Sequence, residues 1–340
     1  MPRKTKMNSI TSPELLAQVN PENKQLKSDF LDYLRSVQRS PGTVAGYSND
    51  LDIFFVWVLQ NAKNKPFYKV NKRDIIAYQG WLINSNQNSP ARVRRLKAAL
   101  SSLSNFCENI LSDEEEEYTR FRSIVRKIEN PALVPVREKS IWDADDVEQA
   151  LSKLIENNKY DIACFIALGA YSGRRKAELC RFRVSDFDDG KLVCGGSLYK
   201  SAPILTKGNK MLECYTLAAK FKPYLDLWMS YRNEHGIVSE WLFPNRNDPT
   251  EQMPMSTVNS WAVYLSKLTS SDFYHHQLRH TFVSELVRAG IPDSVIVDIV
   301  GWSSSEMLKI YDDNHKDDKI GMYFDADGIK TVDKKSLSDL

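Results

Sequence analysis

The sequence has no apolar run long enough to cross a membrane, and it has few cysteines. No stretch reaches the roughly 18 consecutive apolar residues that a membrane-spanning helix needs, and the basic start at residues 1–6 is not followed by the apolar segment of a signal peptide. The five cysteines are odd in number and form no CxxC pair, which argues against a disulfide framework or a zinc site. We therefore expect a cytoplasmic protein with buried, reduced thiols and no bound metal.

An excess of charge of either sign is also absent, because 46 Lys and Arg residues stand against 44 Asp and Glu residues. Positive charge is nevertheless clustered at residues 92–97, 120–127 and 174–183, and acidic runs at 113–117 and 312–318 offset it. Binding to nucleic acid depends on where positive charge is displayed and not on its sum. A length of 340 residues allows two domains, each with its own core.

The first part of the chain shows helical periodicity interrupted by proline and glycine. Residues 1–22 predict a flexible tail, because Pro13 and Pro21 would interrupt a helix. Helices are expected at Phe30–Leu34, after Ser40-Pro41-Gly42 with Thr43 as its cap, from Asn71, from Ser89-Pro90 and at Tyr118–Ile128. We expect a helical domain over residues 23–130, followed by an extended linker over residues 131–139.

The second part of the chain, residues 140–313, predicts a mostly helical domain with one small antiparallel β-sheet, so that the fold class is mainly α. The expected strands are Lys191–Cys194, Ala202–Thr206 and Met211–Tyr215, with a tight turn at Gly208-Asn209. The expected helices end at Leu154, cover Tyr160–Tyr171, begin near Arg175, and cover Phe221–Asn233, Thr257–Leu268, His276–Ala289, Ser294–Val300 and Ser304–Asp312. Residues 314–340 form a C-terminal segment.

Several side chains of this second domain have the spacing that phosphate chemistry needs. Arg175 and Glu178 are three residues apart, so they share one helix face and the carboxylate can orient the guanidinium. His276 and Arg279 repeat that spacing on another helix. Two guanidiniums brought together make a permanently charged clamp for a phosphate. Lys207, at the tip of a hairpin, would supply a mobile cation or proton donor.

Each of these features also has an ordinary structural interpretation. Arg175 and Glu178 could form a surface ion pair, and Lys207 could be a polar turn residue. Tyr311 lies on an amphipathic segment, where an aromatic residue more often packs than reacts. The basic residues at the start of the helix after Ser89 could contact DNA or form a solvated face; they are Arg92, Arg94, Arg95 and Lys97.

The motifs taken together resemble the tyrosine recombinase (phage integrase) family. They are Arg-x-x-Glu at 175–178, Thr-Lys at 206–207, His-x-x-Arg-His at 276–280, and Gly-Trp at 301–302 with Tyr311 nine residues after Trp302. The segments Phe30–Leu34, Ser40–Thr43 and Ser89–Leu96 are similar to the helical core-binding domain of that family. The resemblance covers residues 25–315 and implies a core-binding domain followed by a catalytic domain.

The resemblance also implies a role for each motif residue. Tyr311 would attack the scissile phosphate and keep the 3′ end as a phosphotyrosine, without ATP, metal or another cofactor. Arg175 and Arg279 would hold the non-bridging oxygens, and His276 would assist proton transfer at the tyrosine. Lys207 would protonate the 5′-hydroxyl leaving group. The DNA-binding residues would be Thr43, Arg92, Arg94, Arg95, Lys97 and Lys210.

Trp302 stands where most members of that family carry histidine, and this tryptophan is typical of its Cre-like simple recombinases. An indole N–H can donate a hydrogen bond but cannot shuttle a proton, so Trp302 would position a phosphate oxygen and pack against its neighbours. Glu178 would orient Arg175. The implied partners are double-stranded DNA with paired inverted repeats and further copies of the chain, a dimer on one site and a tetramer on two. The segment 314–340 would dock on a neighbouring protomer.

Two other functions stay open from the sequence. The chain could be a catalytically silent DNA-binding or architectural protein of the same fold, although the presence of all the catalytic residue types argues against it. It could also relax supercoils as a type IB topoisomerase, which uses the same chemistry without needing a specific site. The target sequence and the outcome of recombination do not follow from these residues.

Overall fold

The structure, a computed structural model, describes residues 10–132, 142–206, 210–302 and 304–308, with two short strands at 324–325 and 328–329. The chain divides into two compact units, residues 1–138 and 139–340, and each is considered by itself. The division falls inside the segment 131–139 expected as a linker, most of which lies outside the described residues. In the described parts, no helix is both long and apolar enough to span a bilayer.

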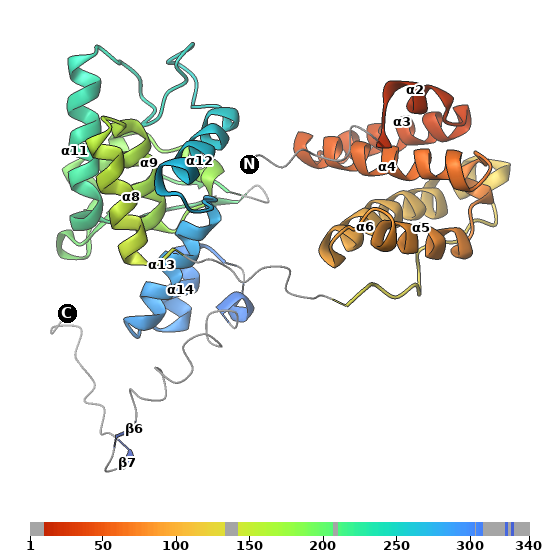
Figure 1. Cartoon of the computed structure of the whole chain (residues 1–340). Helices are drawn as coiled ribbons and strands as arrows, with labels where there is room; N and C mark the ends of the chain where they lie inside the picture. Colours follow the sequence, from red (N-terminus) through yellow and green to blue (C-terminus); the bar gives the residue numbers. More distant parts are fainter. Residues whose placement is uncertain are drawn as a thin grey trace. The chain divides into compact units, whose positions relative to one another are not determined.

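The first unit is a bundle of helices whose starts are fixed by their sequence (Figure 1). Its helices are α2 (Pro13–Gln18), α3 (Pro21–Ser36), α4 (Pro41–Asn61), α5 (Lys72–Asn84) and α6 (Pro90–Phe106), with short turns η1 (Phe67–Lys69), η2 (Cys107–Leu111), α7 (Ser112–Glu114) and η3 (Glu116–Tyr118). Four of the five longer helices open with a Ser-Pro or Asn-Pro pair, and the Ser or Asn side chain accepts a backbone N–H of the first turn. Proline fits the first helical position because its missing N–H would have no partner there.

Three expectations about this unit are wrong. Residues 10–22 are not a flexible tail, because Pro13 and Pro21 start helices and Val19 is buried in the core. The cap of α4 is Ser40, and Thr43 lies inside its first turn. No helix covers residues 118–128, where turns and extended chain follow η3 instead. Pro13 and Pro21 were expected to interrupt a helix, but each one is the first residue of a helix.

Aromatic side chains hold the first unit together. The ring of Phe54 on α4 packs edge-on against Phe67 of η1 and against Tyr78 of α5, with centroids 6.1 and 5.1 Å apart. All three residues are fully buried. Edge-to-face packing of this kind adds about 1 kcal/mol per pair to the burial of the rings. The cluster joins three elements that are separate in the sequence.

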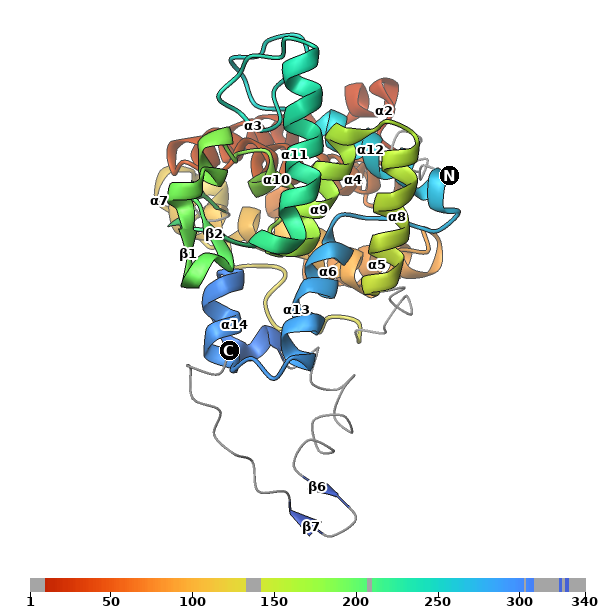
Figure 2. The ribbon, with the colours of Figure 1, turned by 90° about the vertical axis from the view of Figure 1, so that its left-hand side faces the viewer.

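The second unit is built around one apolar helix. Its helices are α8 (Ala144–Glu156), α9 (Tyr160–Ser172), α10 (Lys176–Leu179), α11 (Ala218–Glu234), α12 (Met255–Thr269), α13 (His276–Arg288) and α14 (Asp293–Val300), with short turns η4 (Val184–Phe187), η5 (Asp189–Lys191), η6 (Cys194–Gly196) and η7 (Ser305–Leu308). Every residue from 162 to 170 of α9 is buried, as expected for a helix that is apolar on all sides. Helices α8, α11 and α13 pack around it (Figure 1), and α14 lies beside α13 (Figure 2).

The described strands of the second unit form three small antiparallel sheets. Strand β2 (Leu198–Lys200) lies between β1 (Leu192–Val193) and β5 (Tyr215–Leu217), while β3 (Ile204–Leu205) pairs with β4 (Met211–Leu212). Strand β2 was not predicted from the sequence. The single sheet that was expected is divided into a three-stranded sheet and a separate two-stranded hairpin. The described strands β6 (Phe324–Asp325) and β7 (Gly328–Ile329) also pair. The expected fold class, mainly α with a small antiparallel sheet, is confirmed.

Gly173 ends α9 in a conformation that only glycine adopts easily. Its φ is +62°, and a Cβ atom built on it would lie 2.4 Å from Cδ1 of Phe282 on α13. The missing side chain thus lets the end of α9 contact α13 directly, and the left-handed turn redirects the chain into the two arginines that follow.

Substitution of Gly173 tests this close approach against a matched glycine. Gly290 has a similar φ of +72° at the end of α13, but nothing lies within 4 Å of its built Cβ. Gly290→Ala should lower the free energy of unfolding by about 1 kcal/mol from backbone strain, and Gly173→Ala by about 2–4 kcal/mol because the ring of Phe282 must also move. Urea unfolding curves measure both values. Equal losses would contradict the packing at Gly173.

Candidate active site

Arg175 and Glu178 form a rigid unit at the start of α10. Arg175 is the residue immediately before the helix, and its backbone N–H donates to Oε2 of Glu178 at 3.2 Å. Its Nη1 donates to Oε1 of the same carboxylate at 3.0 Å. The Glu178 side chain is 2% exposed and the Arg175 side chain is 35% exposed. A buried carboxylate therefore orients a guanidinium that still reaches the surface, as the spacing in the sequence predicts.

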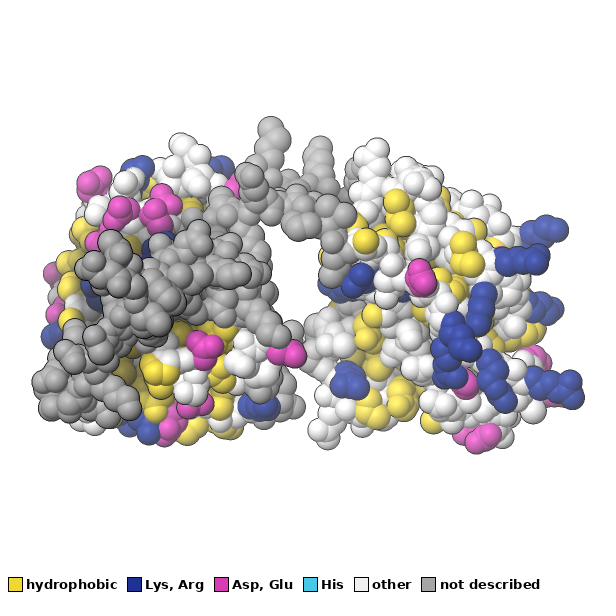
Figure 3. All heavy atoms as spheres, turned by 90° about the horizontal axis from the view of Figure 1, so that it is seen from below, with side chains coloured by type: hydrophobic (Ala, Val, Ile, Leu, Met, Phe, Trp, Pro, Cys, Tyr) yellow, Lys and Arg dark blue, Asp and Glu magenta, His cyan; other side chains and the backbone are white. Residues whose placement is uncertain are grey.

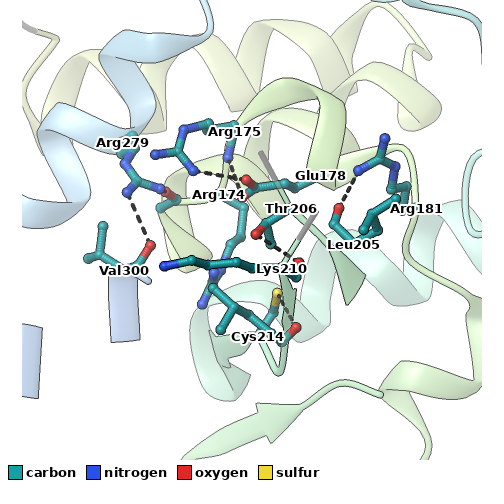
Figure 4. Close-up of polar contacts among 12 residues, drawn as sticks. Arg174, Arg175, Glu178, Arg181, Leu205, Thr206, Lys210, Cys214, Arg279 and Val300 are labelled. Atoms are coloured by element: carbon teal, nitrogen blue, oxygen red, sulfur yellow. Dashed lines mark hydrogen bonds and ion pairs between the residues drawn. The ribbon is translucent and has the colours of Figure 1, made fainter. Parts of the chain in front are cut away.

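Arg279 on α13 connects three elements of the second unit. Its Nη1 donates to the carbonyl of Gly173 at 2.9 Å, and its Nη2 donates to the carbonyl of Val300 at 3.1 Å. The guanidinium carbon lies 5.3 Å from the ring centre of Trp302. Gly173 is two residues before Arg175, so these bonds place both arginines at the same end of α9, as Figure 4 shows.

The three histidines near the start of α13 (His275, His276 and His280) differ in their surroundings. His276 begins α13 and is exposed, and its ring meets that of His280 edge-on at 4.8 Å. His275 is buried, and its Nε2 donates to the carbonyl of Val258 at 3.0 Å. Burial lowers the pKa of His275 to about 4. His275 is therefore a neutral structural residue at pH 7, whereas His276 is exposed to solvent.

The hairpin between β3 and β4 contributes the lysines. Thr206 closes it, because its backbone N–H and its hydroxyl donate to the carbonyl of Lys210 at 2.7 and 3.0 Å. Lys210 is exposed, and in Figure 4 its side chain extends toward the side where Arg279 and Val300 lie. Lys207, at the tip, lies outside the described residues.

Tyr311 also lies outside the described residues, as do the other residues of 309–312 in the helix expected at 304–312. The described part of that segment, Ser305–Leu308, is the 3₁₀ turn η7. Trp302 is half-buried against the Arg279 guanidinium. The structure thus brings together Arg175, Glu178, Arg279 and Trp302 and leaves the placement of Lys207 and Tyr311 as predictions.

Two family models match this chain. One describes the phage integrase family and covers residues 141–318, and the other describes a phage integrase N-terminal SAM-like domain and covers residues 26–117. The first match alone spans more than half of the chain. The chain belongs to the phage integrase family. These recombinases cleave and religate DNA, so the protein is an enzyme of site-specific DNA recombination.

Similar proteins cover most of this recombinase. The SPbeta prophage-derived recombinase-like protein YomM of Bacillus subtilis is 28% identical over 289 residues, which are 84% of this chain and 83% of YomM. XerH bound to a palindromic difH substrate in a post-cleavage complex has a TM-score of 0.63 at 14% identity and covers 93% of each chain. A lambda integrase tetramer bound to a Holliday junction has a TM-score of 0.62 at 16% identity over 85% of this chain and 76% of the other. At these identities the two structures show a shared fold.

The arginines of α6 form ion pairs and hydrogen bonds with other residues of the same chain. Asp50, which is fully buried on α4, pairs with Arg92 at 2.8 Å and with Arg95 at 3.3 Å. Arg94 donates twice to the carbonyl of Pro131, at 2.9 and 3.1 Å. The Arg95 side chain is 59% exposed. Of the arginines on α6, Arg95 therefore presents the most charge to solvent.

Lys97 does not face solvent, so the structure gives no support to the expectation that it binds DNA. It is 3% exposed, and its Nζ donates to Oε1 of Gln79 and to the carbonyls of Ile128 and Glu129. Burial lowers its pKa. Periodicity could not reveal this, because a long lysine side chain can reach acceptors outside its own helix. Figure 3 nevertheless shows Lys and Arg side chains gathered on one face of the first unit.

Two residues of the recombinase that the sequence analysis missed are fully buried. Asp50 lies on α4 close to other polar residues, among them Asn49 and Asp52, so its sequence neighbours do not reveal that it is buried. Arg174 is 1% exposed and donates to the carbonyls of Glu213 and Ile299. The sequence offers one indication that Arg174 is buried. It directly precedes Arg175, and adjacent side chains of extended backbone point to opposite sides.

The buried His275 predicts a pH dependence of stability. Because the folded pKa is about 4 and the unfolded pKa is about 6.5, the unfolded chain binds a proton that the folded chain excludes as the pH falls through this window. Between pH 6.5 and 4, this residue alone should lower the free energy of unfolding by about 1.4 kcal/mol for each unit by which the pH falls. His275→Gln should remove that part of the slope between pH 6.5 and 4 in urea unfolding, while Gln retains an N–H donor for Val258. Parallel curves for the two proteins would contradict the assignment.

Proposed function

We propose that this recombinase cleaves DNA by attack of the Tyr311 hydroxyl on the scissile phosphorus. A bond forms between the tyrosine oxygen and phosphorus, the bond to the 5′ oxygen breaks, and the 3′ end stays on the protein as a phosphotyrosine. Attack by a 5′-hydroxyl of the partner strand reverses these steps and releases the tyrosine. The observation that carries the proposal is the meeting of Arg175 and Arg279 at the end of α9, through the bond from Arg279 to Gly173.

The two guanidiniums would bind the non-bridging oxygens of the phosphate. Glu178 holds Arg175 from behind, and two backbone carbonyls with the ring of Trp302 hold Arg279. Donors fixed in advance stabilise the charge that develops at phosphorus without reorganising during the reaction. Loss of one such donor typically slows a reaction by about 10²–10³-fold.

Proton transfers would be divided between His276 and Lys207. His276 is exposed at the start of α13, and it would act at the tyrosine oxygen. Lys207 would donate a proton to the departing 5′ oxygen, and Lys210 would contact the DNA backbone beside it. Because the energy of the broken phosphodiester is kept in the phosphotyrosine, the exchange proceeds without ATP, metal or another cofactor.

The substrate would be double-stranded DNA with inverted repeats, bound by a dimer on one site and by a tetramer when two sites meet. The palindromic substrate of XerH and the Holliday-junction tetramer of lambda integrase support this assembly, because both share the fold. Contacts from the first unit would come from Thr43 in the exposed first turn of α4 and from Arg92, Arg94 and Arg95 on α6. The reaction would take place in the cytoplasm, where such DNA is found.

Replacement of the nucleophile is the direct test. Tyr311→Phe should abolish the covalent adduct on a nicked substrate with the native site, because the attacking oxygen is gone. Site binding should change by less than about threefold, since only a hydroxyl is lost. Gel analysis under denaturing conditions detects the adduct, and mobility shift gives the affinity.

Tyr323→Phe is the matched control, the same change at a tyrosine downstream, and it should still form the adduct. An adduct that survives Tyr311→Phe would identify another nucleophile. Relaxation of supercoiled plasmid that lacks the site would instead indicate topoisomerase activity.

The contribution of Arg95 to DNA binding can be tested through salt dependence. Arg95→Ala leaves Asp50 paired with Arg92, so no buried carboxylate is uncompensated. The slope of log affinity against log salt should become shallower by about 1.

Arg126→Ala is a matched control for this experiment. The Arg126 side chain is 61% exposed and pairs at 3.1 Å with Glu108, which lies beyond the other end of α6. Its replacement should leave the slope unchanged. An unchanged slope for Arg95→Ala would assign the basic start of α6 to a solvated face.

A further inference from the structure

We propose that Arg174 is a positioning residue that ties the segment between β4 and β5 to the C-terminal end of α14. The inference rests on the proposed function, because these two elements lead to the expected proton donor and the expected nucleophile. Arg174 itself touches no substrate in this proposal. It differs in this from its neighbour Arg175, whose guanidinium reaches the surface.

The surroundings of Arg174 require it to bond to the protein. It is 1% exposed, and its Nη2 donates to the carbonyl of Glu213 at 3.4 Å and to the carbonyl of Ile299. Among the described residues it forms no ion pair with a carboxylate. A buried guanidinium without a counter-charge is stable only if polar groups replace its water. The two carbonyls are therefore constraints on where both segments can lie.

The contact with α14 falls where a helix needs external donors. The last carbonyls of an α-helix have no partner inside the helix and carry a partial negative charge. At the end of α14, Arg174 bonds the carbonyl of Ile299 and Arg279 bonds that of Val300. Two positive groups thus bond to the carbonyls of Ile299 and Val300, the last two residues of α14.

A second contact joins the same elements without Arg174. Gly301 follows α14 with a φ of +70°, and a Cβ built on it would lie 2.9 Å from Cδ1 of Leu212 on β4 and 3.1 Å from Nη1 of Arg174. Strand β4, Arg174 and the end of α14 therefore meet at one point, which we call the β4–α14 junction. Figure 4 shows Arg174 extending from the helix end toward Cys214, beside Lys210 and Thr206.

The β4–α14 junction lies between the segment that leads to the expected proton donor and the segment that leads to the expected nucleophile. Strand β4 returns from the hairpin that carries Lys207, and the chain after Gly301 continues through Trp302 to Tyr311. Fixing one segment against the other restricts where the two segments that lead to the expected leaving-group acid and the expected nucleophile can start. Small displacements of reacting groups cost up to about 10²-fold in rate. Arg174 would thus affect cleavage without affecting binding.

A matched control separates positioning from simple stability. Arg232 is also buried, at 2% exposure, and it donates to the carbonyls of Ser239, Trp241 and Leu242. None of these partners belongs to the site. Arg174→Met and Arg232→Met each remove a buried guanidinium that is bonded to the backbone, so they should cost similar stability.

The experiment compares the two variants as full-length proteins at conditions that keep both folded. At saturating protein, Arg174→Met should slow formation of the covalent adduct on the nicked site by about tenfold or more, with site affinity unchanged within about threefold. Arg232→Met should change neither quantity by more than that margin. Hydrogen exchange should rise in residues 293–302 and 211–217 for Arg174→Met, and in residues 232–242 for Arg232→Met.

Equal cleavage rates for the two variants, or exchange that rises in the same residues in both, would overturn the proposal. If the unmodified protein forms no adduct at all, the proposed function fails, and hydrogen exchange still decides whether the junction exists.

Gly301→Ala provides a second variant if Arg174→Met does not fold. It disturbs the junction from the other side, while Gly290→Ala introduces the same change at a left-handed helix end in open space. Slower cleavage for Gly301→Ala and not for Gly290→Ala would support the junction. Equal rates for these two glycine variants would count against it.

Discussion

The C-terminal ends of α9 and α14 present carbonyl oxygens that need donors, and buried guanidinium groups supply them. Arg279 bonds Gly173 at the end of α9 and Val300 at the end of α14, and Arg174 bonds Ile299. Because both arginines are buried, none of these three bonds can be exchanged for a bond to water without a large cost in free energy. The relative placement of α9, α13 and α14 depends on these contacts, and the arginines that we propose to bind phosphate lie at the same helix ends.

Glycine makes these helix ends accessible. Gly173 and Gly301 both adopt a left-handed conformation, and both are approached by side chains that a Cβ would displace. The first brings α9 against Phe282 and the second brings α14 against Leu212. Steric fit between backbone and side chains thus complements the bonds of the arginines, and both kinds of contact involve the same short segments.

Much of this arrangement could be predicted from the sequence, for identifiable reasons. The pairs Ser89-Pro90 and Asn71-Asp74 mark helix starts through local hydrogen bonds, and Arg175 with Glu178 needs only helical spacing to meet. The failures at Lys97 and Arg174 involve contacts over long distances in the sequence. The buried position of Lys97 depends on carbonyls more than thirty residues away, and Arg174 depends on Ile299, 125 residues away. Spacing within one helix carries no information on such partners.

The burial of Arg279 affects how the site would meet a phosphate. The residue is 2% exposed, so most of its hydration has been removed during folding. A phosphodiester that reaches it would displace little water from the protein side and would feel the cation through a medium of low polarity, where Coulomb attraction is several times stronger than at the surface. The neighbouring Arg175 keeps contact with solvent. The two arginines would therefore differ in response to ionic strength, with screening by dissolved salt acting mainly on Arg175.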